Sequence, residues 1–173
     1  MGQASTSHPS EQAKRHLREL LHDFDTAMLV THGSPGGPCH ARPMAVAEIG
    51  EDCSVWFISR ADAPKIDEID SDREIAAVFQ QPRKYLSVSG RAELHRDRAR
   101  IQAVWQESFR PWFEGGKDDP NILLIRLNPS EAEYWDNTGA KGLRFALKEA
   151  AAYVSGRELT GPGDVSQHAK VQL

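Results

Sequence analysis

Apolar residues near the start of the chain recur at helical spacing. Leu17, Leu20, Leu21 and Phe24 stand at i, i+3, i+4 and i+7, which predicts an amphipathic helix over residues 11–24. Because its one apolar stripe needs a partner, we expect this helix to pack on a sheet.

Most of the other apolar residues fall in short runs bounded by turn residues, which is the pattern of strands. Between residues 85 and 95 apolar and polar residues alternate, which predicts a strand with one face towards solvent. The predicted strands cover residues 26–31, 39–49, 53–59, 74–79, 85–95, 121–127 and 131–135.

Helical patterns return at three places. Pro64 marks the start of a short helix over residues 65–69, and Ile101 and Val104 indicate another over residues 97–106. A last helix is expected over residues 141–155, after a barrel domain over residues 10–140. Polar ends at residues 1–9 and 156–173 are expected to be a disordered and a flexible tail. Since strands and helices do not alternate regularly, an antiparallel β-barrel with peripheral helices is favoured over a doubly wound sheet.

The composition fits one soluble globular domain. Of 173 residues 39% are apolar, and the formal net charge of −4 gives no general attraction to nucleic acid or to an anionic membrane. The start of the chain lacks the pattern of a secretory signal and no apolar run is long enough to span a membrane, so we expect a cytoplasmic protein. Cys39 and Cys53 are expected to be reduced and buried.

One group of polar residues could bind an anion. If the predicted hairpin closes tightly, Arg42 lies across from one of residues 59–61, close to Ser59. Lys65 follows in the first turn of the short helix, where free amides also favour negative charge. Together these residues form an anion clamp, and Pro43 marks a point where something other than a strand meets the backbone.

Spacing alone favours a simpler alternative, in which these cations are surface charges paired with acidic neighbours. The cations are Arg42, Arg60 and Lys65, and the neighbours are Asp62, Asp67 and Glu68. The histidines and cysteines do not share one face at ligand spacing, so no metal site is predicted. Four aromatic residues could form a core or interface cluster, or could cover a ligand; they are Trp105, Phe109, Trp112 and Phe113.

Four segments strengthen the clamp interpretation. They are Ala41-Arg42-Pro43-Met44, Trp56-Phe57-Ile58-Ser59 with Lys65, Gly90-Arg91-Ala92-Glu93, and Pro129-Ser130-Glu131-Ala132-Glu133-Tyr134-Trp135. In this order they resemble the pyridoxamine 5′-phosphate oxidase-like superfamily, and most closely its general stress protein branch, over about residues 11–138. The resemblance implies a six-stranded split barrel that binds flavin mononucleotide (FMN) and forms a homodimer with two flavin sites at the interface.

The resemblance also implies roles for nine residues. The FMN phosphate would be held by Arg42, Ser59 and Lys65. The flavin ring would meet the main chain of Pro43 and Met44, with Tyr85 near it. The pocket would be lined by Phe57 and Ile58, and Trp135 would approach the flavin from the other subunit.

Three departures from the family's oxidases narrow the function. Ala63-Pro64-Lys65 stands where the oxidases carry Ser-Arg-Lys, which removes phosphate contacts, and Tyr85 replaces a glutamine. The Arg-Leu-His-x-Arg signature that grips pyridoxal phosphate is missing from residues 137–144. We therefore expect no pyridoxamine phosphate oxidase activity.

Two functions are compatible with this pattern. The first is a non-catalytic FMN-binding general stress protein with a role in redox stress. The second is a flavin-dependent reductase or oxidase acting on a small substrate, with the flavin supplying the redox chemistry. FAD could replace FMN in either, and a barrel using haem or deazaflavin is a third, more distant alternative. No catalytic residue stands out.

Overall fold

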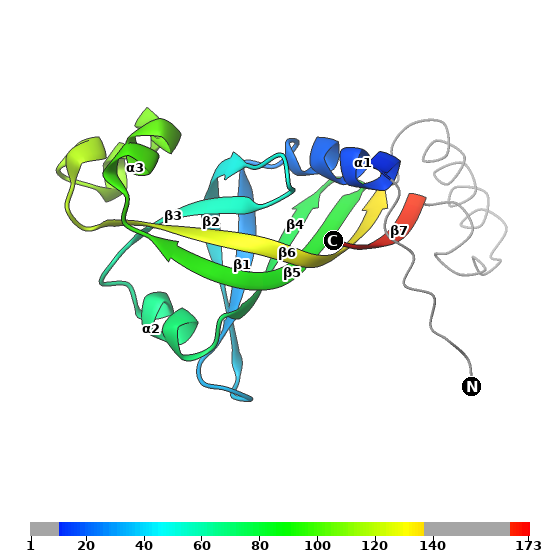
Figure 1. Cartoon of the computed structure of the whole chain (residues 1–173), viewed down its shortest axis with the longest axis horizontal. Helices are drawn as coiled ribbons and strands as arrows, with labels where there is room; N and C mark the ends of the chain where they lie inside the picture. The colour runs from blue at the N-terminus through cyan, green and yellow to red at the C-terminus, as the bar shows by residue number, and fades with distance from the viewer. Residues whose placement is uncertain (1–10, 137–166) are drawn as a thin grey trace, which may run out of the picture.

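Six antiparallel strands close into a barrel in the computed structural model, which describes residues 11–136 and 167–173 (Figure 1). The strand order is β3-β2-β1-β4-β5-β6, and pairing of β3 with β6 closes the barrel. The mostly-β fold with peripheral helices is thereby confirmed. The strands are β1 (Thr26–His32), β2 (Cys39–Ile49), β3 (Val55–Arg60), β4 (Glu74–Gln81), β5 (Lys84–His95) and β6 (Ile122–Asp136).

The last barrel strand, β6, is one long strand, where the sequence predicts two strands separated at Pro129. The prediction is wrong because a bulge carries the ladder past the proline: the β5–β6 register shifts at Gly90, which pairs with Pro129 and leaves Ser130 as the extra residue. A Cβ atom at Gly90 would lie 2.0 Å from the carbonyl oxygen of Asn128, so only glycine permits this close approach.

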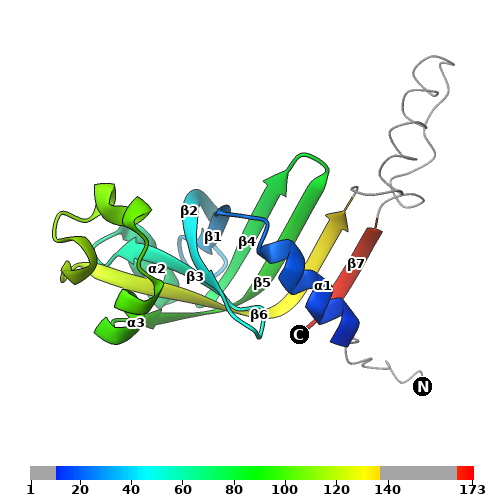
Figure 2. The same cartoon turned by 90° about the horizontal axis from the view of Figure 1, so that it is seen from above.

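The helices lie around the barrel. They are α1 (Glu11–Leu21), α2 (Pro64–Ser71) and α3 (Arg98–Val104), with two short 3₁₀ helices, η1 (Glu107–Trp112) and η2 (Gly116–Asp118). Helix α1 lies towards one end of the long axis and α3 with its neighbours towards the other, as both views show (Figures 1 and 2). None of the helices in the described part of the chain is long and apolar enough to cross a membrane.

Three of the helix predictions need adjustment at their ends. Helix α3 covers Arg98–Val104 and not the whole of residues 97–106. Helix α1 ends at Leu21 and not at Phe24, although Phe24 is still buried in the core. Helix α2 begins at Pro64, as proline's fixed φ angle favours, and runs two residues past the predicted end at Ile69.

The buried apolar residues form two clusters on either side of β3. Leu17, Leu29 and Phe57 belong to the larger cluster, which contains residues of α1 and of the barrel strands. The smaller cluster joins Ile58 to Phe109 and other residues of α3 and η1. Because successive strand residues face opposite sides, β3 is buried on both faces, and its residues separate the barrel interior from the α3–η1 region.

A seventh strand, β7 (Gln167–Gln172), extends the sheet beyond β6. The predicted flexible tail over residues 156–173 is wrong for this last part: Val171 is buried opposite Ala132, and the Leu173 N–H donates to the Ser130 carbonyl at 2.9 Å. The polar sequence of this segment does not indicate the strand. The predicted tail at 1–9, the helix at 141–155 and the tail over 156–166 lie outside the described residues.

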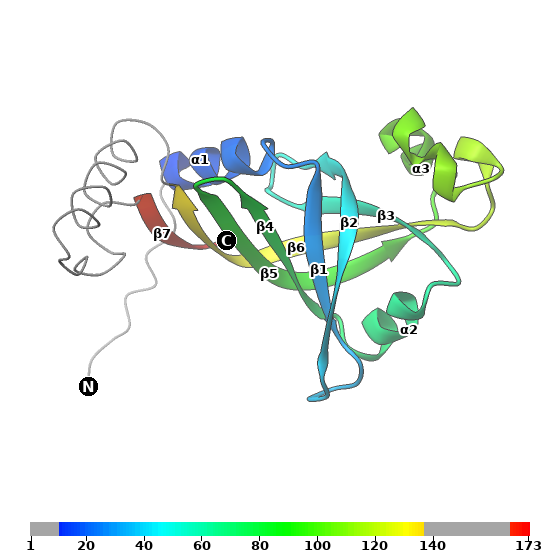
Figure 3. The ribbon, with the colours of Figure 1, turned by 180° about the vertical axis from the view of Figure 1, so that it is seen from behind.

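The β1–β2 hairpin extends away from the body of the barrel beside α2 (Figure 3). Cys39 lies at the start of β2, where it is exposed, with its Sγ 3.6 Å from Nδ1 of His32. The expectation of burial is correct for Cys53 and wrong for Cys39, because Cys39 lies at the exposed start of β2 near the hairpin turn.

Candidate functional site

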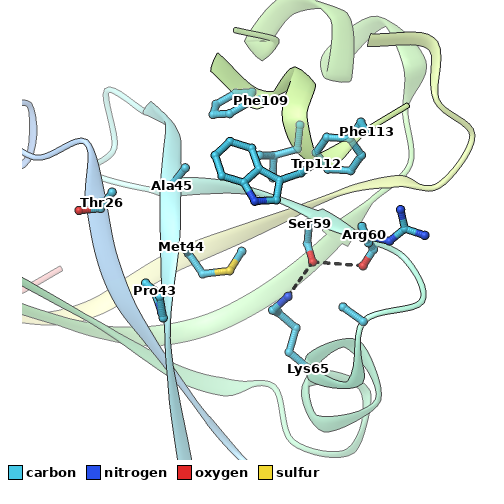
Figure 4. A pocket seen from close by; sticks show the side chains of 12 residues that line it. Thr26, Pro43, Met44, Ala45, Ser59, Arg60, Lys65, Phe109, Trp112 and Phe113 are labelled. Atoms are coloured by element: carbon cyan, nitrogen blue, oxygen red, sulfur yellow. Dashed lines mark hydrogen bonds between the residues drawn. The ribbon is translucent and has the colours of Figure 1, made fainter. Parts of the chain in front are cut away.

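A cavity of about 430 Å³ opens where β2 and β3 part. The β2–β3 ladder includes the pair Val46–Phe57 and goes no further towards the hairpin tip, where β2 continues against β1 and β3 against β6. Helix α2 and η1 flank the resulting gap (Figure 4). The cavity is lined by Thr26, Pro43, Met44, Ala45, Ile58, Ser59, Arg60, Ala63, Lys65, Phe109, Trp112 and Phe113.

Five of the nine predicted site residues line this cavity. Strand β2 contributes Pro43 and Met44, strand β3 contributes Ile58 and Ser59, and helix α2 contributes Lys65. Two consecutive strands and the helix that follows them thus meet at one place.

Lys65 and Ser59 form the polar end of the cavity. The Lys65 ammonium donates to Oγ of Ser59 at 3.2 Å, and that hydroxyl donates to the carbonyl oxygen of Arg60 at 3.1 Å (Figure 4). Arg60 also lines the cavity, but its guanidinium is paired with Asp62 through two hydrogen bonds of 3.0 and 2.9 Å. The polar end therefore offers one ammonium and one hydroxyl.

Lys65 differs from Arg42 and Arg60, which are each paired with a carboxylate. Among the described residues Lys65 forms no ion pair, and its ammonium donates a hydrogen bond to Ser59. Burial lowers the pKa of Lys65 below its usual range, and the positive charge of Arg42 lowers it further, against the opposing effect of Glu68. A half-buried ammonium that another cation repels gains from a nearby anion, because the anion replaces lost hydration.

Arg42 lies outside the cavity lining, in a separate polar network. Its guanidinium donates to Oε2 of Glu68 at 2.7 Å and to the buried hydroxyl of Thr31. Thr31 in turn donates to Glu68 at 2.5 Å, and Nδ1 of His40 lies 2.6 Å from the other carboxylate oxygen. The predicted pairing of Arg42 with one of residues 59–61 is absent, because β2 pairs there with β1 and Arg42 lies opposite Leu29.

This network changes the acid–base behaviour of Glu68. Burial raises the pKa of Glu68, but hydrogen bonds from Thr31, His40 and Arg42, together with the charge of Arg42, outweigh it and lower the pKa to about 2. The simpler alternative, in which the cations are paired with acidic neighbours, thus holds for Arg42 with Glu68 and for Arg60 with Asp62. It does not hold for Lys65 within the described residues.

The opposite wall of the cavity is apolar. Met44 and Ile58 form part of it, and η1 with the residue after it adds Phe109, Trp112 and Phe113 (Figure 4). The sequence marks these aromatic residues as a cluster but does not assign them to the site. One signal in the sequence could assign them to the site. They lie between Ile101 and β6, and β6 pairs with β3, so this segment must lie close to β3.

Three other predicted residues lie elsewhere. Phe57 is completely buried in the barrel interior, since it faces the opposite side of β3 from Ile58. Tyr85 and Trp135 are paired across β5 and β6, and Tyr85 is exposed. Neither of the two lines the cavity of this chain. Among the described residues, no group of three or more His, Cys, Asp or Glu side chains is placed to hold a metal ion.

Comparison with known proteins gives a consistent result. The family model described as pyridoxamine 5′-phosphate oxidase like matches residues 12–160, which is most of the chain. The chain belongs to this family. The chain is similar to general stress protein 26 of Bacillus subtilis (strain 168). The identity is 22% over 138 residues, which cover 76% of this chain and 93% of that protein.

Solved structures of family members share the barrel. A Jannaschia sp. CCS1 protein described as a candidate general stress protein 26 is 21% identical, with a TM-score of 0.72, 94% of this chain covered and 99% of that one. The general stress FMN/FAD binding protein of Xanthomonas citri is 28% identical, with a TM-score of 0.63, 76% of this chain covered and 93% of that one. The first similarity shows the fold, and the second adds a relative named for flavin binding.

Proposed function

We propose that the cavity between β2, β3, α2 and η1 binds FMN and that the protein acts as a flavin-binding general stress protein. The observation that carries the proposal is Lys65, a half-buried cation with no carboxylate partner in the described residues, at the polar end of an otherwise largely apolar cavity. A phosphate satisfies the ammonium and the Ser59 hydroxyl, while a flat ring fills the apolar part. The flavin-binding relative in Xanthomonas citri supports the same ligand class.

The chain's own residues would divide the ligand between them. Lys65 and Ser59 would hold the phosphate, and Pro43 and Met44 would meet the ring beside the gap that β2 leaves open. Arg42 would act differently from the role that the family resemblance implies: held by Glu68 and Thr31, it would fix α2 against β1 and β2, and its positive charge would act on the site without contact to the phosphate. The bound flavin itself would supply any redox chemistry.

A homodimer would complete this site. Ten neighbouring positions on the outer faces of β2, β1, β4 and β5 are uncharged, and the Glu74–Arg91 pair borders them. Within this area Met28 and Val78, paired across β1 and β4, are 41% and 42% exposed. Such an uncharged sheet face is typical of an interface between copies. By register this face consists of Ala41, Pro43, Ala45, Thr26, Met28, Val30, Ala76, Val78, Ser87 and Ser89.

The cavity and the proposed interface are continuous, since Thr26, Pro43 and Ala45 belong to both. Tyr85 and Trp135 extend the same outer face, so a partner subunit docked there would meet them. This supports the expected contact of Trp135 with the flavin of the other subunit. Sedimentation of the wild type should give a dimer, and Val78→Lys should give a monomer; a monomeric wild type would overturn the interface.

The central test is flavin binding by the purified protein. Titration with FMN should quench flavin fluorescence, and the bound flavin should show a structured visible absorption band. No change on titration would end the proposal. Riboflavin, FMN and FAD compared under the same conditions establish which flavin is preferred.

Turnover is the alternative to binding alone. No carboxylate, histidine or cysteine lines the part of the cavity that the described residues form, so catalysis would depend on the flavin and its donor. Bleaching of bound FMN by NADH or NADPH, with reoxidation by an added acceptor, would favour a reductase or oxidase over a binding protein. Because Ala63 replaces a phosphate contact and residues 137–144 lack the pyridoxal phosphate signature, we expect no oxidation of pyridoxamine phosphate.

A further inference from the structure

Trp112 is the most exposed of the large hydrophobic side chains in the described residues, at 63%. Its neighbours Phe109 and Phe113 are buried in the cluster that joins η1 to β3 and β6. Trp112 thus leaves a large aromatic surface uncovered on the wall of a cavity, although burial of such surface is favourable. A ligand in the cavity would cover it.

The backbone that carries Trp112 is held from both sides. Phe109 and Phe113 each contact the Trp105 ring, with ring centroids 6.0 Å apart in both cases, and Pro111 restricts the backbone directly before Trp112. The Phe113 N–H donates to the Arg110 carbonyl at 3.1 Å. The backbone that places the indole beside the cavity is therefore held by buried neighbours.

The cavity has its two kinds of chemistry at different places. Figure 4 shows the Trp112 ring on the side of η1, Met44 on the neighbouring strand, and the Lys65–Ser59 pair on the side of α2. A flavin has the same division, with a planar aromatic ring at one end and a phosphate at the other. An indole and an isoalloxazine ring can stack with their faces offset, an arrangement that aromatic pairs prefer.

We infer that Trp112 is the residue that binds the flavin ring, by stacking of its indole on the isoalloxazine, while Lys65 binds the phosphate. This inference rests on the proposed flavin function and assigns the ring to the η1 side of the cavity. It also divides the earlier aromatic cluster: Phe109 and Phe113 are core residues, and Trp112 is a ligand contact.

Three flavins that share one ring test this division. Lumiflavin has the ring without the ribityl chain, riboflavin adds the chain, and FMN adds the phosphate. Trp112→Ala should weaken binding of all three by a similar factor of about tenfold, the value expected for one aromatic stack. Lys65→Ala should weaken FMN alone. Trp112→Phe keeps a ring and should retain most of the affinity for each ligand.

Trp105→Phe is the matched control, because Trp105 packs beside the same aromatic residues but does not line the cavity. Its affinity for lumiflavin should equal that of the wild type. Tryptophan emission gives an independent signal: each flavin should quench less of it in Trp112→Phe than in Trp105→Phe.

The outcomes separate the two levels of the argument. If the wild type binds no flavin, the proposed function fails. If it binds FMN but Trp112→Ala keeps wild-type affinity for lumiflavin, or loses affinity for FMN alone, the role of Trp112 is overturned and the flavin site stands. Trp112→Leu, with circular dichroism and melting compared to the wild type, excludes a folding defect as the cause of lost binding.

Discussion

Arg42 and Lys65 are two cations beside the same gap in the barrel, yet the structure treats them in opposite ways. Arg42 is bound by Glu68 and Thr31, with its side chain 22% exposed and that of Glu68 14% exposed. Lys65 is half-buried, repelled by Arg42, and hydrogen-bonded to a hydroxyl. The Arg42 charge is balanced within the chain, and the Lys65 charge is balanced only in part.

The difference separates a cation that is paired within the chain from the one that we propose binds the phosphate. An ion pair that already has hydrogen bonds on both partners gains little from a further anion and loses stability if broken. A desolvated ammonium without a carboxylate gains directly from a phosphate. We therefore expect the counter-charge around each cation, more than its position in a family motif, to decide which one binds the phosphate.

The largest effect is expected from Arg42→Ala, and it should be on stability. Removal of the guanidinium leaves Glu68 and the buried Thr31 without their shared donor, at a cost of about 2–3 kcal/mol in the free energy of unfolding. Denaturant unfolding at neutral pH measures this. If Arg42 has no phosphate contact, FMN and riboflavin lose affinity by equal factors; a loss confined to FMN would return Arg42 to the clamp.

Lys65→Ala should have its main effect on binding. A charge-assisted hydrogen bond to phosphate is worth about 2 kcal/mol, so FMN affinity should fall by roughly thirtyfold while riboflavin affinity stays the same. Arg60→Ala is the matched control, since Arg60 borders the same cavity but is paired with Asp62. Isothermal titration with the two flavins gives both comparisons, and equal losses in the two variants would remove the distinction between paired and unpaired cations.

Contacts in the site could be predicted from the sequence when the two residues are close together along the chain. Pro64 places Lys65 in the first turn of a helix, and one turn separates that helix from Ser59, so local rules bring the two together. The pairing of Arg42 with Glu68 spans 26 residues and depends on how α2 docks beside β1, which no local pattern specifies.

The same limit applies to the aromatic wall and to the last strand. Phe109 and Trp112 are three residues apart in η1, where side chains at i and i+3 lie on one side, so spacing alone does not tell buried Phe109 from exposed Trp112. Strand β7 carries little apolar surface of its own and is recognised by its pairing with β6. In both places the tertiary partner, and not the segment, determines the structure.

The smallest effect concerns acid stability and tests the Glu68 side of the comparison. Hydrogen bonds in the folded state lower the pKa of Glu68 from 4.5 to about 2. The ionised carboxylate therefore stabilises the fold in full at pH values above 4.5, the ordinary pKa of the group. That contribution is lost as pH falls from about 4.5 towards 2. Glu68→Gln keeps acceptors for Arg42 and Thr31 but cannot titrate. Its free energy of unfolding should therefore depend less on pH in this window than that of the wild type, and parallel curves would mean that the Glu68 contacts do not depend on its charge.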